Sequence, residues 1–235
     1  LIYERALRYA FHASGISTFD LLLEYYTELL FSFRETEGSI SFERMGLMSM
    51  AAFHPPTYVH SLMVGSISRL LAEHLLRHRP EAFAGTFAAD SAKEAERQRE
   101  VILGHVYHAA LCHDFGKLPM IDTISVYGRR LMDSEYDLLK HHPVMGARML
   151  SAHGSTRAYA SAALHHHRWY DGTRGYPLES APDRTPDDIF TAIISVADSL
   201  DAATDNVGRS YNRGKLPEEV FCEITDGSGT RYAPE

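Results

Sequence analysis

Apolar residues recur along most of the chain at intervals of three and four positions, a spacing that places them on one face of an α-helix. Runs that alternate apolar and polar residues, or that gather β-branched residues, are few. The helical pattern is clear in residues 19–34 and again in residues 59–77. The pattern therefore predicts an all-α protein.

The segment 59–77 carries an apolar stripe with His60 close to it. Helical spacing connects the members of this stripe, which are Met63, Ile67, Leu70 and Leu71. Another helix is predicted over residues 186–204, with Thr185 as its cap, Pro186 at its first position and acidic residues in its first turn. We expect its buried side to comprise Ile189, Ile193, Val196 and Leu200.

Caps and prolines indicate where further helices begin. Ser134 and Asp137 form a capping-box pattern at the start of a short helix over 134–140. Pro143 then indicates either a new first turn or a kink directly after two histidines.

Two prolines in the segment AAFHPPTY, residues 51–58, interrupt the helical pattern and mark the expected domain boundary. We expect an N-terminal helical segment over residues 1–50, with a role in dimerisation or signal input. One larger domain is expected over residues 51–235.

Composition argues against several classes of function. The 235 residues carry a net charge of −8, whereas a binder of polymeric nucleic acid presents a basic face. No run of about 18 or more apolar residues occurs, so no membrane span is expected in this segment. Two cysteines in so long a chain favour a reducing, cytoplasmic setting over a disulfide framework.

Histidine is the unusual residue, with 14 copies, and several copies lie near aspartates in separate apolar helices. The side chains able to bind metal are His60, His113, Asp114, His142, His166, His167 and Asp198. Imidazole and carboxylate together suit iron, manganese and zinc. Seven ligands are too many for one ion and suit two ions that share a bridging carboxylate. Such a pair, held about 3.5–4 Å apart, activates water for an in-line phosphoryl displacement.

Four segments in this order resemble the HD-GYP branch of the HD-domain phosphohydrolases: CHDFGKLPMID (112–122), HHPVMGARML (141–150), HHRWYDGTRGYP (166–177) and VADSLDAATD (196–205). A single His-Asp pair would be a weak signal, but four elements in order with a Gly-Tyr-Pro turn are specific. The resemblance covers residues 56–215. It implies an HD-domain helical bundle with a dinuclear or trinuclear metal centre. It also implies hydrolysis of a cyclic dinucleotide, usually cyclic di-GMP.

The resemblance implies a role for each matching residue. The first ion would be held by His60, His113, Asp114 and Asp198, and the second by His142, His166 and His167 with Asp114 as the bridge. The substrate phosphate would be contacted by Lys117, Arg168, Arg209 and Arg213, with Lys117 at the scissile phosphate. Gly175, Tyr176 and Pro177 would form a loop beside the centre, which some family members use to contact partner proteins.

Departures from the family pattern change these expectations. Trinuclear members carry a glutamate four residues before the first histidine, and here that residue is Pro56, so we expect two ions. Arg168 replaces the glutamate of the common motif, and Arg174 is an additional residue before the Gly-Tyr-Pro loop. His165 is expected to be a neighbour of the ligands. Asp201 either orients a histidine ligand or is a solvated carboxylate, and both interpretations stay open.

The expected reaction is hydrolysis of a 3′–5′ phosphodiester by a hydroxide that bridges two divalent ions, iron or manganese. One alternative is an HD phosphohydrolase with a single metal that acts on another nucleotide or phosphate ester, which would leave His142, His166 and His167 without a role. Another is a catalytically weak receptor that binds a cyclic dinucleotide and signals through the Gly-Tyr-Pro loop. Besides the cyclic dinucleotide, we expect a protein partner at the Gly-Tyr-Pro loop. We also expect the chain to form a homodimer.

Overall fold

The computed structural model describes residues 40–121, 131–178, 184–205 and 214–234. All regular elements in these ranges are helical, which confirms the predicted all-α class. They are α3 (Phe42–Phe53), α4 (Pro55–His78), η1 (Pro80–Phe83), α5 (Ala92–Arg97), α6 (Arg99–Cys112), η2 (Phe115–Met120), α8 (Asp133–Leu139), α9 (His142–Ser151), η3 (Arg157–Tyr159), α10 (Ala160–His165), α11 (Asp188–Thr204) and α12 (Pro217–Asp226).

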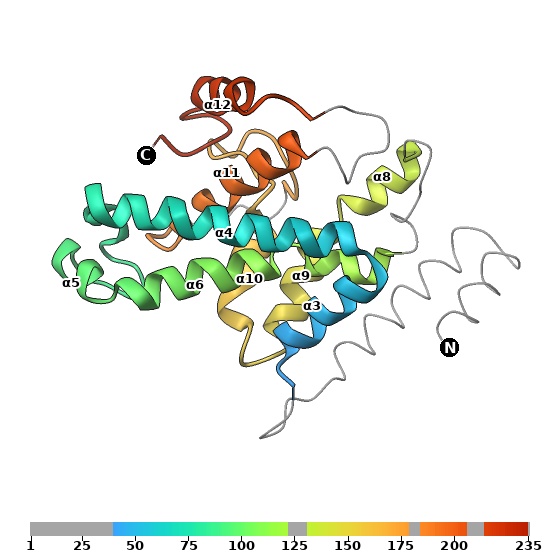
Figure 1. The fold of residues 1–235 in the computed structure, drawn as a ribbon, viewed down its shortest axis with the longest axis horizontal. Helices are drawn as coiled ribbons and strands as arrows, with labels where there is room; N and C mark the ends of the chain where they lie inside the picture. The colour runs from blue at the N-terminus through green and yellow to red at the C-terminus, as the bar shows by residue number, and fades with distance from the viewer. Residues whose placement is uncertain (1–39, 122–130, 179–183, 206–213, 235) are drawn as a thin grey trace, which may run out of the picture.

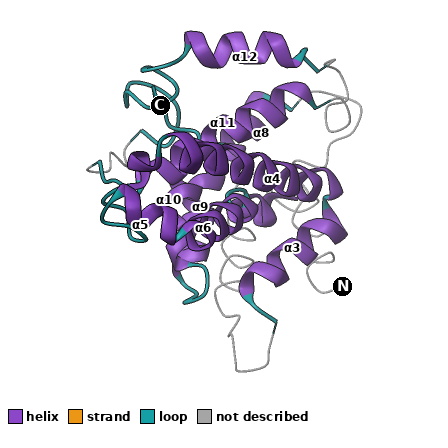
Figure 2. Ribbon diagram, turned by 60° about the vertical axis from the view of Figure 1, so that its left-hand side comes forward, coloured by secondary structure: helices purple, strands orange, loops and turns teal. Residues whose placement is uncertain are grey.

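The long helix α4 is central to the bundle (Figure 1). It packs along α6 and is also in contact with α3 and α11, while α9 packs against α10 and η2. The outermost helix, α12, lies over α11 (Figures 1 and 2). Three segments that are distant in sequence, on α4, α9 and α11, therefore meet around the junction of α6 and η2.

Helix α4 confirms the helix predicted over 59–77, but the predicted apolar stripe is wrong in part. Met63 and Leu70 are 46% and 65% exposed, and the buried face carries mainly small residues. At Gly65 an added Cβ would lie 3.2 Å from side-chain atoms of Leu111 and Tyr107. Small side chains face the core because α4 and α6 approach each other closely.

Helix α11 begins two residues later than predicted, at Asp188. Instead of capping the helix, Thr185 donates its backbone N–H to the Asp188 carboxylate at 3.1 Å. Ile189 and Ile193 are buried as predicted, whereas Val196 and Leu200 are half-buried.

The other helix starts are partly as predicted. The N-cap of α8 is Met132 rather than Ser134, and the Glu135 carboxylate accepts the Met132 N–H at 2.7 Å. The capping box therefore lies two residues earlier than the predicted Ser134 and Asp137. Pro143 lies in the first turn of α9, as one of its two interpretations predicted. The predicted break within 51–58 is also confirmed, since the single residue His54 separates α3 from α4.

Some predictions lie outside the described residues. These are the helix over 19–34 and the substrate contacts of Arg209 and Arg213. The division of the chain at residue 50 stays a prediction. Among the described helices, none combines the length and the apolar character that a membrane crossing requires.

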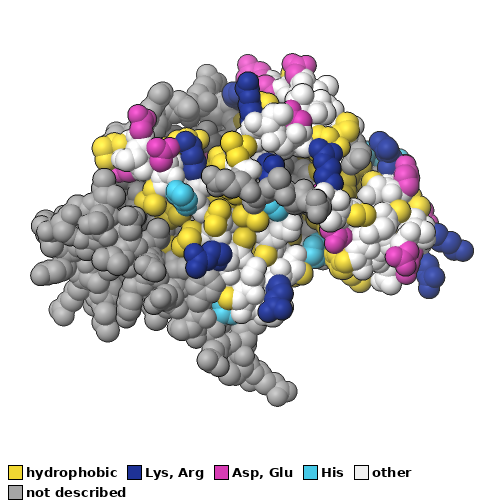
Figure 3. Space-filling view, turned by 180° about the vertical axis from the view of Figure 1, so that it is seen from behind, with side chains coloured by type: hydrophobic (Ala, Val, Ile, Leu, Met, Phe, Trp, Pro, Cys, Tyr) yellow, Lys and Arg dark blue, Asp and Glu magenta, His cyan; other side chains and the backbone are white. Residues whose placement is uncertain are grey.

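One of the buried hydrophobic clusters lies around the junction of α6 and η2. Phe42 and Met50 of α3 pack in one buried cluster with Phe115 of η2 and Met149 of α9. On the face opposite to that of Figure 1, Lys and Arg side chains are spread among hydrophobic and uncharged surface (Figure 3).

Candidate metal centre

His113 and Asp114 lie at the junction between α6 and η2 and are both fully buried. The chain beyond them approaches α9 closely at Gly116. A Cβ added there would lie 1.8 Å from the carbonyl oxygen of His142 and 2.5 Å from the amide nitrogen of Gly146. Glycine at this position therefore allows α9 to place His142 beside Asp114.

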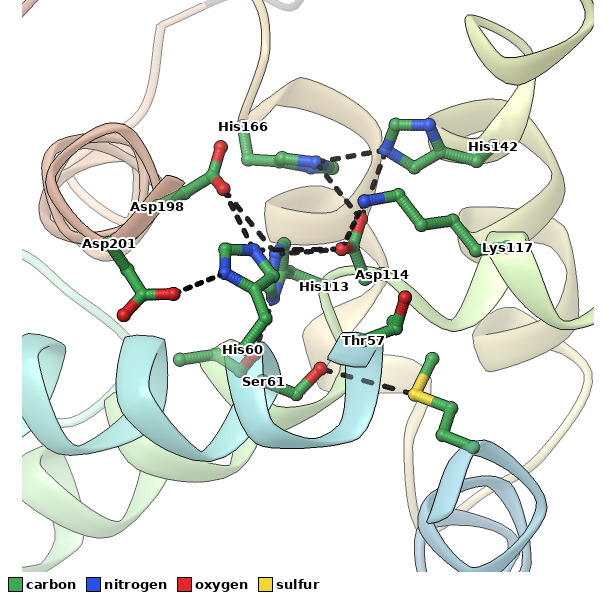
Figure 4. A network of polar contacts seen from close by, with 12 residues as sticks. Thr57, His60, Ser61, His113, Asp114, Lys117, His142, His166, Asp198 and Asp201 are labelled. Atoms are coloured by element: carbon green, nitrogen blue, oxygen red, sulfur yellow. Dashed lines mark hydrogen bonds and ion pairs between the residues drawn. The ribbon is translucent and has the colours of Figure 1, made fainter. Parts of the chain in front are cut away.

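The two carboxylate oxygens of Asp114 face different histidines (Figure 4). Oδ1 lies 3.2 Å from His142 Nε2 and 3.9 Å from His166 Nε2. Oδ2 lies 3.5 Å from His113 Nε2 and 3.7 Å from His60 Nε2. One carboxylate thus connects two sets of imidazoles, which is the geometry that a bridging ligand needs.

Asp198, on α11, closes the other side of the centre. Its Oδ1 lies 3.1 Å from His60 Nε2 and 3.9 Å from His113 Nε2. Its Oδ2 lies 3.6 Å from Nδ1 of His167, at the end of the segment that follows α10. All seven residues predicted as ligands are thereby brought together.

The arrangement fits metal ions. Groups of potential ligand atoms within 4.8 Å of one another are formed by His60, His113 and Asp198, by His113, Asp114 and His166, and by His142, His166 and His167. His113 Nε2 and Asp114 Oδ1 are buried without a hydrogen-bond partner. Leaving such atoms unsatisfied is costly, so cations bound at these two atoms would supply the missing interactions. The nitrogen and oxygen donor set suits iron, manganese or zinc.

Four of the histidines are oriented by oxygen atoms at Nδ1. These oxygens are Asp201 Oδ2 for His60 at 2.6 Å, Ala110 O for His113 at 2.6 Å, Leu139 O for His142 at 2.7 Å and Ala163 O for His166 at 2.8 Å. With Nδ1–H donating to the oxygen, Nε2 presents its lone pair to the centre. Of the two interpretations of Asp201, the structure favours orientation of a histidine.

Burial and neighbouring charges set the protonation states. Burial alone would raise the pKa of Asp114, but Lys117 and His113 hold it well below its usual range. Burial lowers the pKa of His166 and brings that of His167 to about 3. Although burial opposes protonation, hydrogen bonds to Asp198 and Asp201 raise the pKa of His60 to about 9. His60 would therefore release a proton when a cation binds.

A cavity of about 900 Å³ opens over this centre. Gly175 and Tyr176 line it, and the Tyr176 ring centroid lies 4.7 Å from that of His167. Gly175 has a φ of +85°, and a Cβ there would lie 2.2 Å from the His167 carbonyl oxygen. The predicted Gly-Tyr-Pro loop thus lies beside the metal centre.

Lys117 and Arg168 line the cavity, and their contact with a substrate stays a prediction. Lys215 and Arg231 also line it, and sequence reasoning missed both. The signal that could have found Arg231 is the segment GSGTRY, in which two glycines indicate a tight turn after α12.

His165 belongs to a different cavity, of about 480 Å³, and is not part of the potential ligand groups. His105 packs against Phe190, and burial lowers its pKa to about 4. His108 contacts the Glu43 carboxylate at 2.7 Å. None of these three histidines belongs to the potential ligand groups among the described residues.

The HD domain family model matches residues 57–203, which is more than half of the chain and contains all seven of these residues. The chain belongs to the HD domain family. This confirms the resemblance predicted from the four motifs.

Relatives of the chain include a cyclic di-GMP phosphodiesterase of Thermotoga maritima, 34% identical over 72% of this chain and 45% of the relative. A cyclic di-GMP phosphodiesterase response regulator of Xanthomonas campestris pv. campestris is 36% identical over 54% of this chain and 32% of the relative. A 3′3′-cGAMP-specific phosphodiesterase of Vibrio cholerae is 30% identical over 55% of this chain and 24% of the relative. The chain thus spans less than half the length of these relatives.

Proposed function

We propose that this chain is a metal-dependent phosphodiesterase that hydrolyses a cyclic dinucleotide, with cyclic di-GMP as the expected substrate and two iron or manganese ions as cofactors. The observation that carries the proposal is the buried carboxylate of Asp114, whose two oxygens face two different sets of histidines. The names of the relatives support the choice of substrate.

The roles proposed for the side chains follow from their positions. His60, His113 and Asp198 would hold one ion, and His142, His166 and His167 the other, with Asp114 shared between them. Two bound divalent ions would supply positive charge to the phosphate and promote the ionisation of water. Because burial keeps His166 and His167 neutral, their lone pairs are available as ligands without a proton being lost first.

Lys117 is the side chain proposed to meet the scissile phosphate. Its ammonium lies 2.5 Å from Asp114 Oδ2 and lines the cavity. A phosphate held beside the same carboxylate by the ions would be within reach of the ammonium group. The attraction between the ammonium and the phosphate would strengthen as negative charge develops on the phosphoryl oxygens.

Two ions, rather than three, are proposed because Pro56 lies in the first turn of α4 and has no ligand atom in its side chain. The neighbouring His54 is engaged as the cap of α4, where its Nδ1 lies 2.7 Å from Thr57 Oγ1. An HD enzyme with one metal is less favoured, because three histidines around Asp114 Oδ1 and Asp198 Oδ2 would then have no role.

Product analysis tests the proposal. The protein is loaded with Mn²⁺ or Fe²⁺ and incubated in parallel with cyclic di-GMP and 3′,3′-cGAMP, and the products are separated by chromatography. We expect linear dinucleotide or mononucleotides from cyclic di-GMP, and none from Asp114→Asn. Asp137→Asn is the matched control, because that carboxylate is 69% exposed on α8 and pairs with Lys140. Tight binding without turnover would instead support the receptor alternative, and turnover of 3′,3′-cGAMP alone would reassign the substrate.

The partner contact at Gly175, Tyr176 and Pro177, the homodimer and the cytoplasmic setting stay predictions. Exposed Arg174 lies over the Trp169 ring, 5.2 Å from its centroid, on the same loop. This surface is where a protein partner is proposed to bind.

A further inference from the structure

The basic side chains around the metal-centre cavity differ in how their charge is balanced. Lys117 pairs with Asp114, and Lys215 pairs with Glu223 at 2.5 Å. Arg231 instead contacts neutral groups: its Nη2 lies 3.4 Å from Ser199 Oγ, and its guanidinium carbon lies 5.0 Å from the centroid of the Tyr232 ring. Within the described part of the chain, Arg231 has no ion pair with an acidic group. Its positive charge is therefore available to an anion in the cavity.

A closed turn after α12 fixes the backbone of Arg231. Arg231 N–H and Tyr232 N–H donate to the Gly227 carbonyl at 2.9 and 3.0 Å, and Gly229 N–H donates to the Tyr232 carbonyl at 2.9 Å. Gly229 has a φ of +76°, in the left-handed region that glycine adopts without strain. The Tyr232 side chain is 5% exposed and anchors the turn.

This turn is also hydrogen-bonded to the segment 166–177, which carries the Gly-Tyr-Pro loop beside the metal centre. The Arg231 carbonyl accepts the Tyr170 N–H at 3.1 Å, and the Thr230 carbonyl accepts the Asp171 N–H at 2.9 Å. On its other side the guanidinium reaches Ser199, the residue after Asp198 on α11. Arg231 is thus held between two elements of the site, although in the described structure it contacts none of the seven potential ligands.

We propose that Arg231 is a substrate-binding residue that holds the phosphate of a cyclic dinucleotide that is not being cleaved. A cyclic dinucleotide carries two phosphodiester groups, and only one of them can lie at Asp114. The guanidinium fork matches two phosphate oxygens, which an ammonium group does not. Its position beside Ser199, without a contact to any of the seven potential ligands in the described structure, suits the second phosphate. This inference rests on the proposed function and adds a specificity determinant to it.

The test compares a substrate with two phosphates and a substrate with one. Steady-state kinetics are measured for wild type, Arg231→Ala and Arg231→Lys with cyclic di-GMP and with bis(p-nitrophenyl) phosphate, which has a single phosphodiester. Loss of a charge-assisted hydrogen bond should raise KM for cyclic di-GMP about 10- to 100-fold with little change in kcat. Arg231→Lys should show a smaller rise, and KM and kcat for the single phosphodiester should be unchanged.

Arg77→Ala is the matched control, because Arg77 is 66% exposed, pairs with Glu73 and lies 17 residues after His60 on α4. At 1.5 Å per residue this is about 25 Å along the helix. Thermal unfolding midpoints show whether the variants keep the folded structure.

Two results would overturn the assignment of Arg231: an unchanged KM for cyclic di-GMP, or an equal loss on both substrates, which would indicate a structural role or a role in the chemistry. A wild-type protein that cleaves only the single phosphodiester would contradict the proposed function itself, and the Arg231 proposal would fall with it. The wild-type reaction therefore distinguishes the two failures.

Discussion

Asp201 offers a sharp test of how the site is organised, because it acts through another residue. Its Oδ2 lies 2.6 Å from His60 Nδ1, while His60 Nε2 faces Asp198 and Asp114. Replacing Asp201 by alanine removes the acceptor that fixes the imidazole ring and its tautomer, but removes none of the seven potential ligands.

The size of the effect follows from the burial of this pair. The side chains of His60 and Asp201 are only 15% and 14% exposed, so water replaces the lost acceptor poorly. A hydrogen bond to a charged group of this kind contributes about 1.5–3 kcal/mol. If that stabilisation is lost from the metal-bound state, Asp201→Ala should bind the ion at His60 about 10- to 100-fold more weakly. The metal affinity of Asp201→Asn should lie between those of wild type and Asp201→Ala, because the amide oxygen of asparagine still accepts a hydrogen bond but carries no charge.

Competition with a fluorescent chelator measures Mn²⁺ affinity for wild type, both Asp201 variants and the Asp137→Asn control. Phosphodiesterase activity is then followed as Mn²⁺ is raised, and we expect the activity of Asp201→Ala to recover at high metal concentration. Wild-type affinity in Asp201→Ala would refute the reasoning. A loss of activity that excess metal does not restore would also refute it, since that result would indicate that Asp201 takes part in the reaction instead of orienting His60.

Three other perturbations have expected outcomes. Gly116→Ala should destabilise the protein by at least about 1–3 kcal/mol in denaturant unfolding and weaken metal binding, because its Cβ would meet the His142 backbone; unchanged values for both would contradict the packing described around Asp114. Chelation should lower the thermal midpoint by about 5–10 °C, reversibly on adding Mn²⁺, because His113 Nε2 and Asp114 Oδ1 are left unsatisfied; an unchanged midpoint would argue against a cation there. Burial lowers the pKa of His105 from 6.5 to about 4, so the unfolded chain binds more protons in this range and wild-type stability should rise with pH. Between about pH 5 and pH 7, the free energy of unfolding measured with denaturant should rise by about 2 kcal/mol less in His105→Phe than in wild type. The same pH dependence in both proteins would refute the assignment of this rise to His105.

Much of the metal centre could be predicted because its residues lie in short motifs whose order is visible in the chain. Helical periodicity places His60 and Asp198 within helices, and the His113-Asp114 pair is a local signal. The sequence could not show which oxygen of Asp114 faces which histidine, since that depends on the approach of α9 at Gly116. The role of Asp201 stayed open for a similar reason, because its partner is 141 residues away in the chain.

The wrong predictions have physical causes. The pattern of large apolar residues on α4 suggested a core face with Met63 and Leu70, but close packing against α6 selected the face with Gly65. Arg231 was missed because its place in the cavity depends on a turn that follows α12 and on backbone hydrogen bonds between this turn and the segment 166–177. Neither interaction has a local periodic signal.

The most direct test of the central claim, two ions sharing the Asp114 carboxylate, is the number of metal ions per chain. Native mass spectrometry on Mn²⁺-loaded protein should find two ions in wild type, one in His142→Ala and one in His60→Ala. Asp114→Ala should retain fewer ions than either of these variants, because its carboxylate faces both sets of histidines. A single ion in wild type, or the loss of both ions in either histidine variant with Asp114 intact, would contradict the account.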